Sequence, residues 1–260
     1  MQKLTLVLNA AESRLQIVLL RDEESLCAQD WAASKRGTEL LAPALEQLFV
    51  ALRLSFADLA AIACVNGPGS FTGIRLTLST AAALARASGA QLAGLDYMQA
   101  LALNARYCRQ AQDDRLHVWV LTHARRDLVH ARPFLLPSAL AQGPCPLPVP
   151  LDKLELLPPA ECVRRISLDI RNGFAVLGVG SAFARHPEFA GLCPRLLPPD
   201  PTPENLALLA AHASYSRQDI EAMYVRPCDA VEKLDQLAQR QGRDPQEMRQ
   251  RLDSLLTKTF

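Results

Sequence analysis

The sequence predicts an α/β protein in which mixed sheets are flanked by helices. Apolar stretches of strand length open the chain at residues 4–8 and 15–20, and a third lies at 59–65. A glycine-rich turn separates this third stretch from a long helical pattern of small residues at 72–88. Strands that alternate with helices in this way form sheets covered by helices.

The first half of the chain supplies the elements of one lobe. A further strand is expected at residues 26–31, so that the chain opens as a β-meander. Apolar residues at helical spacing then predict a helix over residues 38–53. We expect its regular part to begin near Pro43, because proline suits the first turn of a helix. Another strand is expected at 91–95.

The second half of the chain also contains strands and helices. The expected strands are 116–121, 128–134 and 175–181, and the expected helices are 160–170, 204–217, 231–239 and 244–256. Proline-rich stretches at 137–159 and 194–203 predict irregular connections. A polar break at 109–115 marks the lobe boundary. We divide the chain into a first lobe (1–108), a smaller, degenerate second lobe (109–203) and C-terminal helices (204–260) that pack back on the first lobe.

Composition excludes several function classes. The formal net charge of the 260 residues is +1, so no strong field directs the chain to nucleic acid or membrane. The seven cysteines are scattered and include no C-x-x-C pair, which argues against zinc and disulfides and suits a reducing cytoplasm. We expect a cytoplasmic protein, because the chain shows neither a signal-peptide layout nor an apolar run of about 20 residues.

The turn before the small-residue helix reads Gly67-Pro68-Gly69-Ser70-Phe71-Thr72-Gly73-Ile74-Arg75. A strand, a glycine turn and a helix N-terminus in this order can cradle an anion, because free N–H groups and the helix dipole point at one spot. A P-loop would need Lys and Ser/Thr after the last glycine, and none is present. Plain chain reversal is therefore the simpler interpretation, with a remnant phosphate loop as the alternative.

This nonapeptide closely resembles the GPGSFTG(V/I/L)R signature of the TsaB family, also called YeaZ. The stretches 94–101 and 223–227 resemble further segments of that family. The resemblance implies the duplicated, ribonuclease-H-like lobes of the actin/sugar-kinase/Hsp70 superfamily. It also implies a non-catalytic subunit that binds and activates TsaD. TsaD makes threonylcarbamoyladenosine (t6A) at position 37 of tRNAs that read ANN codons. A TsaE ATPase is expected to join the complex, and tRNA is expected to be contacted only indirectly.

The resemblance also implies a partner interface on the two helices 38–53 and 72–88, where the isolated chain would form a homodimer. The small residues of the second helix allow another helix to approach closely, although packing on its own sheet is the simpler use of that face. We assign these residues to the interface: Leu41, Leu45, Leu48, Arg75, Leu78, Ser79, Ala82 and Arg86. We assign these to the structural turn: Gly67, Pro68, Gly69, Ser70, Phe71, Thr72, Gly73 and Arg75.

The chain departs from the superfamily where enzymes hold Mg²⁺ and phosphate. Asn9 stands where the family usually has Asp, and Ala10-Ala11 replace its hydroxyl pair. A neutral amide is a weaker ligand for a hard cation than a carboxylate. Ser70 has no identifiable base, and the TsaD iron motif His-x-x-x-His is missing. His117, His123 and His130 lack metal spacing.

We expect no catalytic residues, no metal and no cofactor. Two alternatives remain open, namely a nucleotide-binding phosphotransferase of the same superfamily and a self-associating scaffold with a divergent partner.

Overall fold

The structure is a computed structural model that describes residues 3–32, 36–107, 116–125, 127–137, 147–225 and 244. The chain divides into two compact units, Met1–Met223 and Tyr224–Phe260. The helices predicted at 231–239 and 244–256 fall outside the described residues, apart from Asp244. The lobe boundary predicted near residue 108 falls outside them as well.

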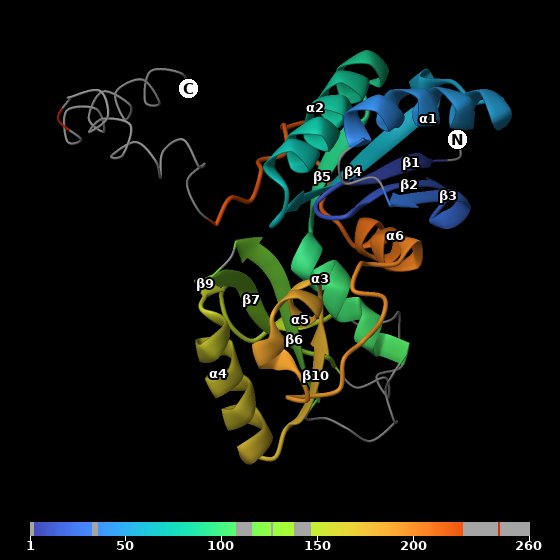
Figure 1. Cartoon of the computed structure of the whole chain (residues 1–260). Helices are drawn as coiled ribbons and strands as arrows, with labels where there is room; N and C mark the ends of the chain where they lie inside the picture. Colours follow the sequence, from blue (N-terminus) through green and yellow to red (C-terminus); the bar gives the residue numbers. More distant parts are fainter. Residues whose placement is uncertain are drawn as a thin grey trace. The chain divides into compact units, whose positions relative to one another are not determined.

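A five-stranded mixed sheet forms the framework of the first half (Figure 1). Its strands are β1 (Leu4–Asn9), β2 (Arg14–Arg21), β3 (Glu24–Ala32), β4 (Leu59–Gly67) and β5 (Gln91–Asp96), in the order β3-β2-β1-β4-β5. The predicted meander is confirmed, because β1, β2 and β3 pair antiparallel, whereas β4 and β5 continue in parallel from β1. The central strand β1 is buried along its whole length, which explains its continuous apolar run.

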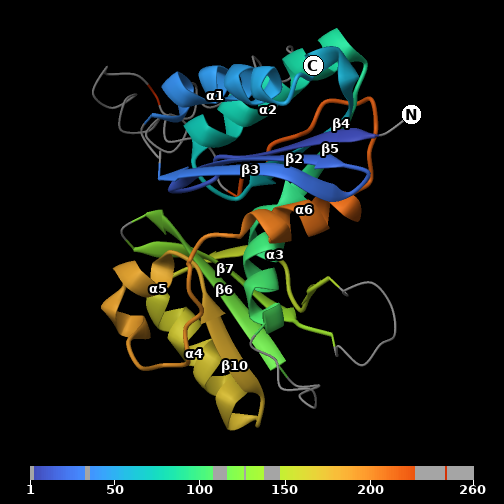
Figure 2. The same ribbon diagram turned by 90° about the vertical axis from the view of Figure 1, so that its right-hand side faces the viewer.

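Helices cover both faces of this first sheet (Figure 2). Helices α1 (Gly37–Ala51) and α2 (Phe71–Ser88) lie on one face, and α3 (Tyr97–Ala102) and α6 (Pro203–Ala211) lie on the other. Two hydrophobic clusters result, one under α1 and α2 and the other shared by α3, α6 and the second sheet. The expectation that regular helix begins near Pro43 is wrong. The helix begins at Gly37 and carries Pro43 in its interior, where this exposed proline forgoes one backbone hydrogen bond.

A second mixed sheet is built from the second half of the chain (Figure 1). Its strands are β6 (Leu116–Arg125), β7 (Leu128–Leu135), β8 (Val149–Pro150), β9 (Glu155–Leu157) and β10 (Ala175–Val179). The order is β10-β6-β7-β8, and β9 also pairs with β7. Helices α4 (Pro159–Arg171) and α5 (Ala182–Arg185) complete this lobe. Short strands β8 and β9 therefore lie in a stretch that was expected to be irregular throughout. The predicted class, mixed sheets flanked by helices, is confirmed.

The segment after α6 is extended rather than helical. α6 ends at Ala211, six residues before the predicted end. Ser216 then exchanges two backbone hydrogen bonds with Leu92 of β5 (2.7 and 2.9 Å). The Met223 N–H donates to the carbonyl of Asn66 at the end of β4 (2.7 Å). At Ser216 this segment pairs with Leu92 on the β5 edge of the first sheet, where the backbone groups would otherwise lack a strand partner.

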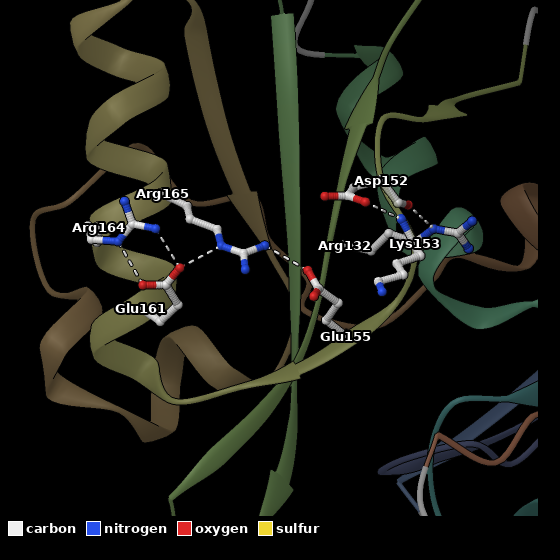
Figure 3. A network of polar contacts seen from close by, with 7 residues as sticks. All are labelled: Arg132, Asp152, Lys153, Glu155, Glu161, Arg164 and Arg165. Carbon is white, nitrogen blue, oxygen red and sulfur yellow. Dashed lines mark hydrogen bonds and ion pairs between the residues drawn. The ribbon is translucent and has the colours of Figure 1, made fainter.

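An ion-pair network ties α4 to β9 in the second lobe (Figure 3). Glu161 bonds both Arg164 and Arg165 at 2.7 Å, and Arg165 reaches Glu155 at 2.7 Å. Hydrogen bonds and charges from the two arginines lower the pKa of Glu161 to about 2. Because this pKa lies below the ordinary value of 4.5, the stabilisation is present above that value and is lost as the pH falls towards 2.

We expect the Glu161 carboxyl carbon to titrate with a midpoint near 2 in an NMR pH series. In the double variant Arg164→Gln/Arg165→Gln, the same carboxyl should titrate in the ordinary glutamate range, because both cations are gone. An unchanged midpoint in that variant would show that the network does not set this pKa.

Candidate functional site

The glycine turn packs directly against the chain that leaves β1. The backbone N–H of Ser70 donates to the carbonyl of Ala11 (2.5 Å), and the Ser70 hydroxyl caps α2 by accepting from the Gly73 N–H (3.2 Å). A Cβ added to Gly69 would lie 2.1 Å from the Ala11 oxygen, and one added to Gly73 would lie 1.9 Å from the Ala10 oxygen. Glycine is therefore required at both positions by close backbone approach.

This packing determines what the start of α2 meets. A helix N-terminus attracts anions through its free N–H groups and its dipole. Here a carbonyl oxygen of the chain itself, that of Ala11, accepts from this turn. On the other side, a Cβ on Gly67 would lie 2.6 Å from the Met223 carbonyl oxygen. These contacts support the structural interpretation of the turn over the phosphate-loop interpretation.

Asn9, at the end of β1, is engaged inside the protein. Its side chain is 1% exposed, its amide nitrogen donates to Gln16 Oε1 (2.7 Å), and its oxygen accepts from the Ala11 N–H (2.9 Å). The side chain thus shapes the turn after β1. Within the described ranges, no group of three or more His, Cys, Asp or Glu side chains is arranged to hold a metal ion.

The Gly-x-Gly element at the end of β10 is also filled from within. A Cβ on Gly178 would lie 2.3 Å from the ring of Phe183, and one on Gly180 would lie 2.3 Å from the Leu121 oxygen. Phe183 is 5% exposed. The Phe183 ring therefore covers this element at Gly178.

The three histidines noted in the sequence lie beside different partners. The pairs are His117 with Asp169 (3.0 Å), His123 with His186 (3.3 Å) and His130 with Thr122 (3.3 Å). Each contact joins a ring nitrogen to a polar atom of a neighbouring element or strand. This placement suits hydrogen bonding within the second lobe.

The leucines assigned to the partner interface on α1 face the protein interior. Leu41, Leu45 and Leu48 are 1%, 3% and 3% exposed and belong to the cluster between α1, α2 and the first sheet. The assignment of these three residues to an exposed surface is therefore wrong in this structure. The physical reason is that an amphipathic surface helix turns its apolar stripe towards the core.

The interface residues proposed on α2 fall into two groups. Arg75, Ser79 and Arg86 are exposed, and Ala82 is partly exposed. Their spacing of three and four residues places them along one side of the helix. We call these four residues the α2 stripe. Leu78 instead packs against both hydrophobic clusters, so it does not belong to the free surface.

Two contacts hold the charged ends of the α2 stripe. The Arg75 guanidinium lies 3.8 Å from the centroid of the exposed Phe71 ring, which is within cation–π range. Arg86 forms an ion pair with Asp219 (2.7 Å) in the extended segment after α6. These contacts hold the two arginines beside the small residues between them.

The sequence interpretation missed the exposed side of α1. Ala42, Pro43, Glu46 and Val50 are exposed there, and Val50 is 71% exposed. Figures 1 and 2 show α1 and α2 side by side on one face of the first sheet. We call the α2 stripe together with these four α1 residues the paired-helix face. The positions opposite the apolar stripe of the α1 helical wheel could have identified them.

At the sequence level, part of the chain is similar to one family of tRNA-modifying enzymes. Residues 31–132 match the family model described as TsaD, tRNA N6-adenosine threonylcarbamoyltransferase. Two curated proteins of that name match over 74 residues. The protein from Erythrobacter litoralis is 35% identical over 28% of this chain and 22% of its own length. The protein from Rhizobium etli is 36% identical over 28% of this chain and 20% of its own length. The chain thus matches about a fifth of the length of these relatives.

Similarity at the structural level extends over most of the chain. An uncharacterized Pseudomonas aeruginosa protein, described as similar to peptidase YeaZ, superimposes with a TM-score of 0.69 at 20% identity, over 86% of this chain and 100% of that one. YeaZ from Pseudomonas aeruginosa gives 0.64 at 19% identity, over 85% and 100%. The predicted two-lobed fold and the resemblance to YeaZ structures are confirmed. The chain therefore has the fold of YeaZ and is similar in sequence to part of TsaD over residues 31–132.

Proposed function

We propose that this chain is a non-catalytic, TsaB-like subunit that binds and activates a TsaD-like transferase in t6A synthesis on tRNA. The observation that carries the proposal is that carbonyl groups of the chain itself fill the glycine turn, where a superfamily enzyme would hold phosphate. The structural similarity to YeaZ and the sequence similarity to part of TsaD support the same pathway.

Two further features support a role without chemistry of its own. Asn9 donates and accepts within the protein, so its oxygen is already engaged. The Phe183 ring covers Gly178 at the end of β10. Chemistry on the tRNA then belongs to the TsaD-like partner, and this chain contacts the tRNA only through that partner. A TsaE-like ATPase joins the pair.

The paired-helix face is the surface that we assign to the TsaD-like partner. It combines small side chains at Ser79 and Ala82 with arginines at either end of the α2 stripe and with the exposed Val50. Small residues let helices of a partner approach closely. In the absence of the partner, the same face would pair two copies of this chain.

Size-exclusion chromatography with light scattering tests the proposal. The purified chain mixed with the TsaD-like protein of the same organism should elute as a complex that contains both chains, and the TsaE-like protein should add to it. A mixture that elutes as two separate species would contradict the proposal, and a mass of two copies of this chain alone would favour the self-associating scaffold.

A nucleotide-binding phosphotransferase is the competing function, because it would use the same strand, glycine turn and helix. Isothermal titration of the isolated chain with ATP and Mg²⁺ separates the two functions. We expect no magnesium-dependent heat of binding, since the turn is filled by the Ala10 and Ala11 carbonyls. Tight magnesium-dependent binding would favour the phosphotransferase.

A further inference from the structure

One glutamate joins the two sheets through hydrogen bonds that the proposed function does not use. Glu12 lies in the turn between β1 and β2 of the first sheet. Its Oε1 accepts from the hydroxyl of Ser181 (2.8 Å), which lies two residues after the end of β10 in the second sheet. Its Oε2 accepts from the hydroxyl of Tyr97 (3.3 Å), the first residue of α3. A single carboxyl group therefore bridges three elements from both lobes.

The next residue makes a second tie in the same place. The Ser13 hydroxyl donates to Asp200 Oδ1 (2.9 Å), which lies in the connection that leads to α6. Asp200 is 9% exposed, and its own backbone carbonyl accepts from the Asn104 amide (3.0 Å). The turn between β1 and β2 is thus held at Glu12 by the second lobe and at Ser13 by the α6 connection.

The groups that face Glu12 set its protonation. Burial raises its pKa to about 7, and the nearby charge of Asp200 also raises it. The hydrogen bonds from Ser181 and Tyr97 and the charge of Arg185 on α5 act in the opposite direction but do not offset burial. Burial lowers the pKa of His123, and the charge of Arg185 lowers it further.

We propose that Glu12 is a proton-operated latch between the two sheets. In its neutral form it holds the β1–β2 turn against Ser181 and Tyr97, and when it ionises the two lobes separate more readily. In the neutral carboxyl one oxygen still accepts from a hydroxyl and the other donates its proton to the hydroxyl oxygen beside it, so both contacts are kept without a buried negative charge beside Asp200. The ionised carboxylate regains water when the contact opens, because a buried charge is costly. The latch does not depend on the proposed function.

The direction of the effect follows from proton linkage. In the separated state Glu12 is in water with its ordinary pKa of 4.5, whereas in the closed state its pKa is about 7. Closing therefore takes up a proton between these two values. The advantage of the closed state is fully present below the lower value and is lost as the pH rises through the higher one. The ratio of molecules in which Glu12 holds the two lobes together to molecules in which this contact is open should fall about tenfold between pH 6 and pH 8.

Hydrogen exchange at pH 6, 7 and 8, corrected for the intrinsic exchange rate, tests the latch. The backbone N–H of His123 is the reporter, because it donates to the Ser181 hydroxyl (2.9 Å). Its protection in the native chain should fall about tenfold across this range. In Glu12→Gln, which keeps an accepting oxygen but cannot ionise, the protection should not change with pH. Buried amides of β1 serve as the reference for global unfolding.

Two further variants complete the test. Glu188→Gln changes an exposed carboxylate of the second lobe and should exchange as the native chain does. Ser181→Ala removes a donor to Glu12, so a weaker contact between the lobes is expected at every pH. In Ser181→Ala the measured quantity is the protection of the Ala11 backbone N–H against hydrogen exchange. This protection should still depend on pH, because Glu12 is still present. The proposal would be overturned if the protection of the His123 N–H in the native chain did not depend on pH. It would also be overturned if Glu12→Gln showed the same pH dependence as the native chain. If Glu12→Gln does not fold, an NMR titration of Glu12 in the native chain decides, and an ordinary midpoint near 4.5 overturns the latch.

Discussion

Replacing Gly73 by alanine should destabilise the protein by about 3 kcal/mol or more, although alanine is the better helix former. Gly73 lies in the first turn of α2, where an added Cβ would be 1.9 Å from the Ala10 carbonyl oxygen. The atom in the way belongs to the backbone, so a rotamer change cannot relieve the overlap. Either the start of α2 or the turn after β1 must move, and the Ser70–Ala11 hydrogen bond lies between them.

Urea unfolding of the native chain and of Gly73→Ala measures this effect. Gly37→Ala is the matched control, because Gly37 also lies in the first turn of a helix but its added Cβ would meet only a side-chain carbon of Leu76 at 3.4 Å. The free energy of unfolding of Gly37→Ala should equal that of the native chain or exceed it by up to about 1 kcal/mol. Equal free energies of unfolding for the two variants would show that the close approach at the glycine turn is not required.

Replacing Ala82 by arginine should weaken binding of the TsaD-like partner at least about 100-fold, which corresponds to about 3 kcal/mol. Ala82 is the small, partly exposed member of the α2 stripe. A long, charged side chain there would hold a partner helix away from α2 and would be desolvated in the contact. Fluorescence anisotropy with the labelled partner gives the dissociation constant.

Two comparisons make the Ala82→Arg result specific. Ala160→Arg places the same side chain at an exposed position near the start of α4 and should leave partner affinity within about twofold of the native value, as for a charge outside the interface. Leu78→Asp is unsuitable, because Leu78 packs against both hydrophobic clusters and its loss would damage the fold itself. Equal affinities for the native chain and Ala82→Arg would place the partner elsewhere.

Much of the fold could be predicted because buried strands have a direct sequence signal. Continuous apolar runs identified β1, β2 and β4, and the small-residue pattern identified α2 to within one residue at its start. The end of α6 was placed too late, because the residues that follow it are compatible with helix. In the structure, the backbone of Ser216 pairs with β5 instead, so a tertiary contact overrides a weak local preference.

The candidate site was less accessible to sequence reasoning. An apolar stripe such as Leu41, Leu45 and Leu48 reports burial, and it carries no information about which opposite residues a partner meets. Glu12 lay in an ordinary polar turn, and its partner Ser181 is 169 positions away in the sequence. The glycine turn was correctly located, but only coordinates show how closely the Ala11 and Ala10 carbonyl oxygens approach Gly69 and Gly73.

The initial rate of t6A formation on a tRNA with adenosine at position 37 tests the proposed activation most directly. The reaction contains the TsaD-like protein, the TsaE-like ATPase and threonylcarbamoyl-adenylate, with or without this chain. We predict that this chain alone makes no product and that its addition to the transferase accelerates modification until the two are equimolar. Ala82→Arg should require a much higher concentration for the same rate. Full modification in the absence of this chain would contradict its role as an activating subunit.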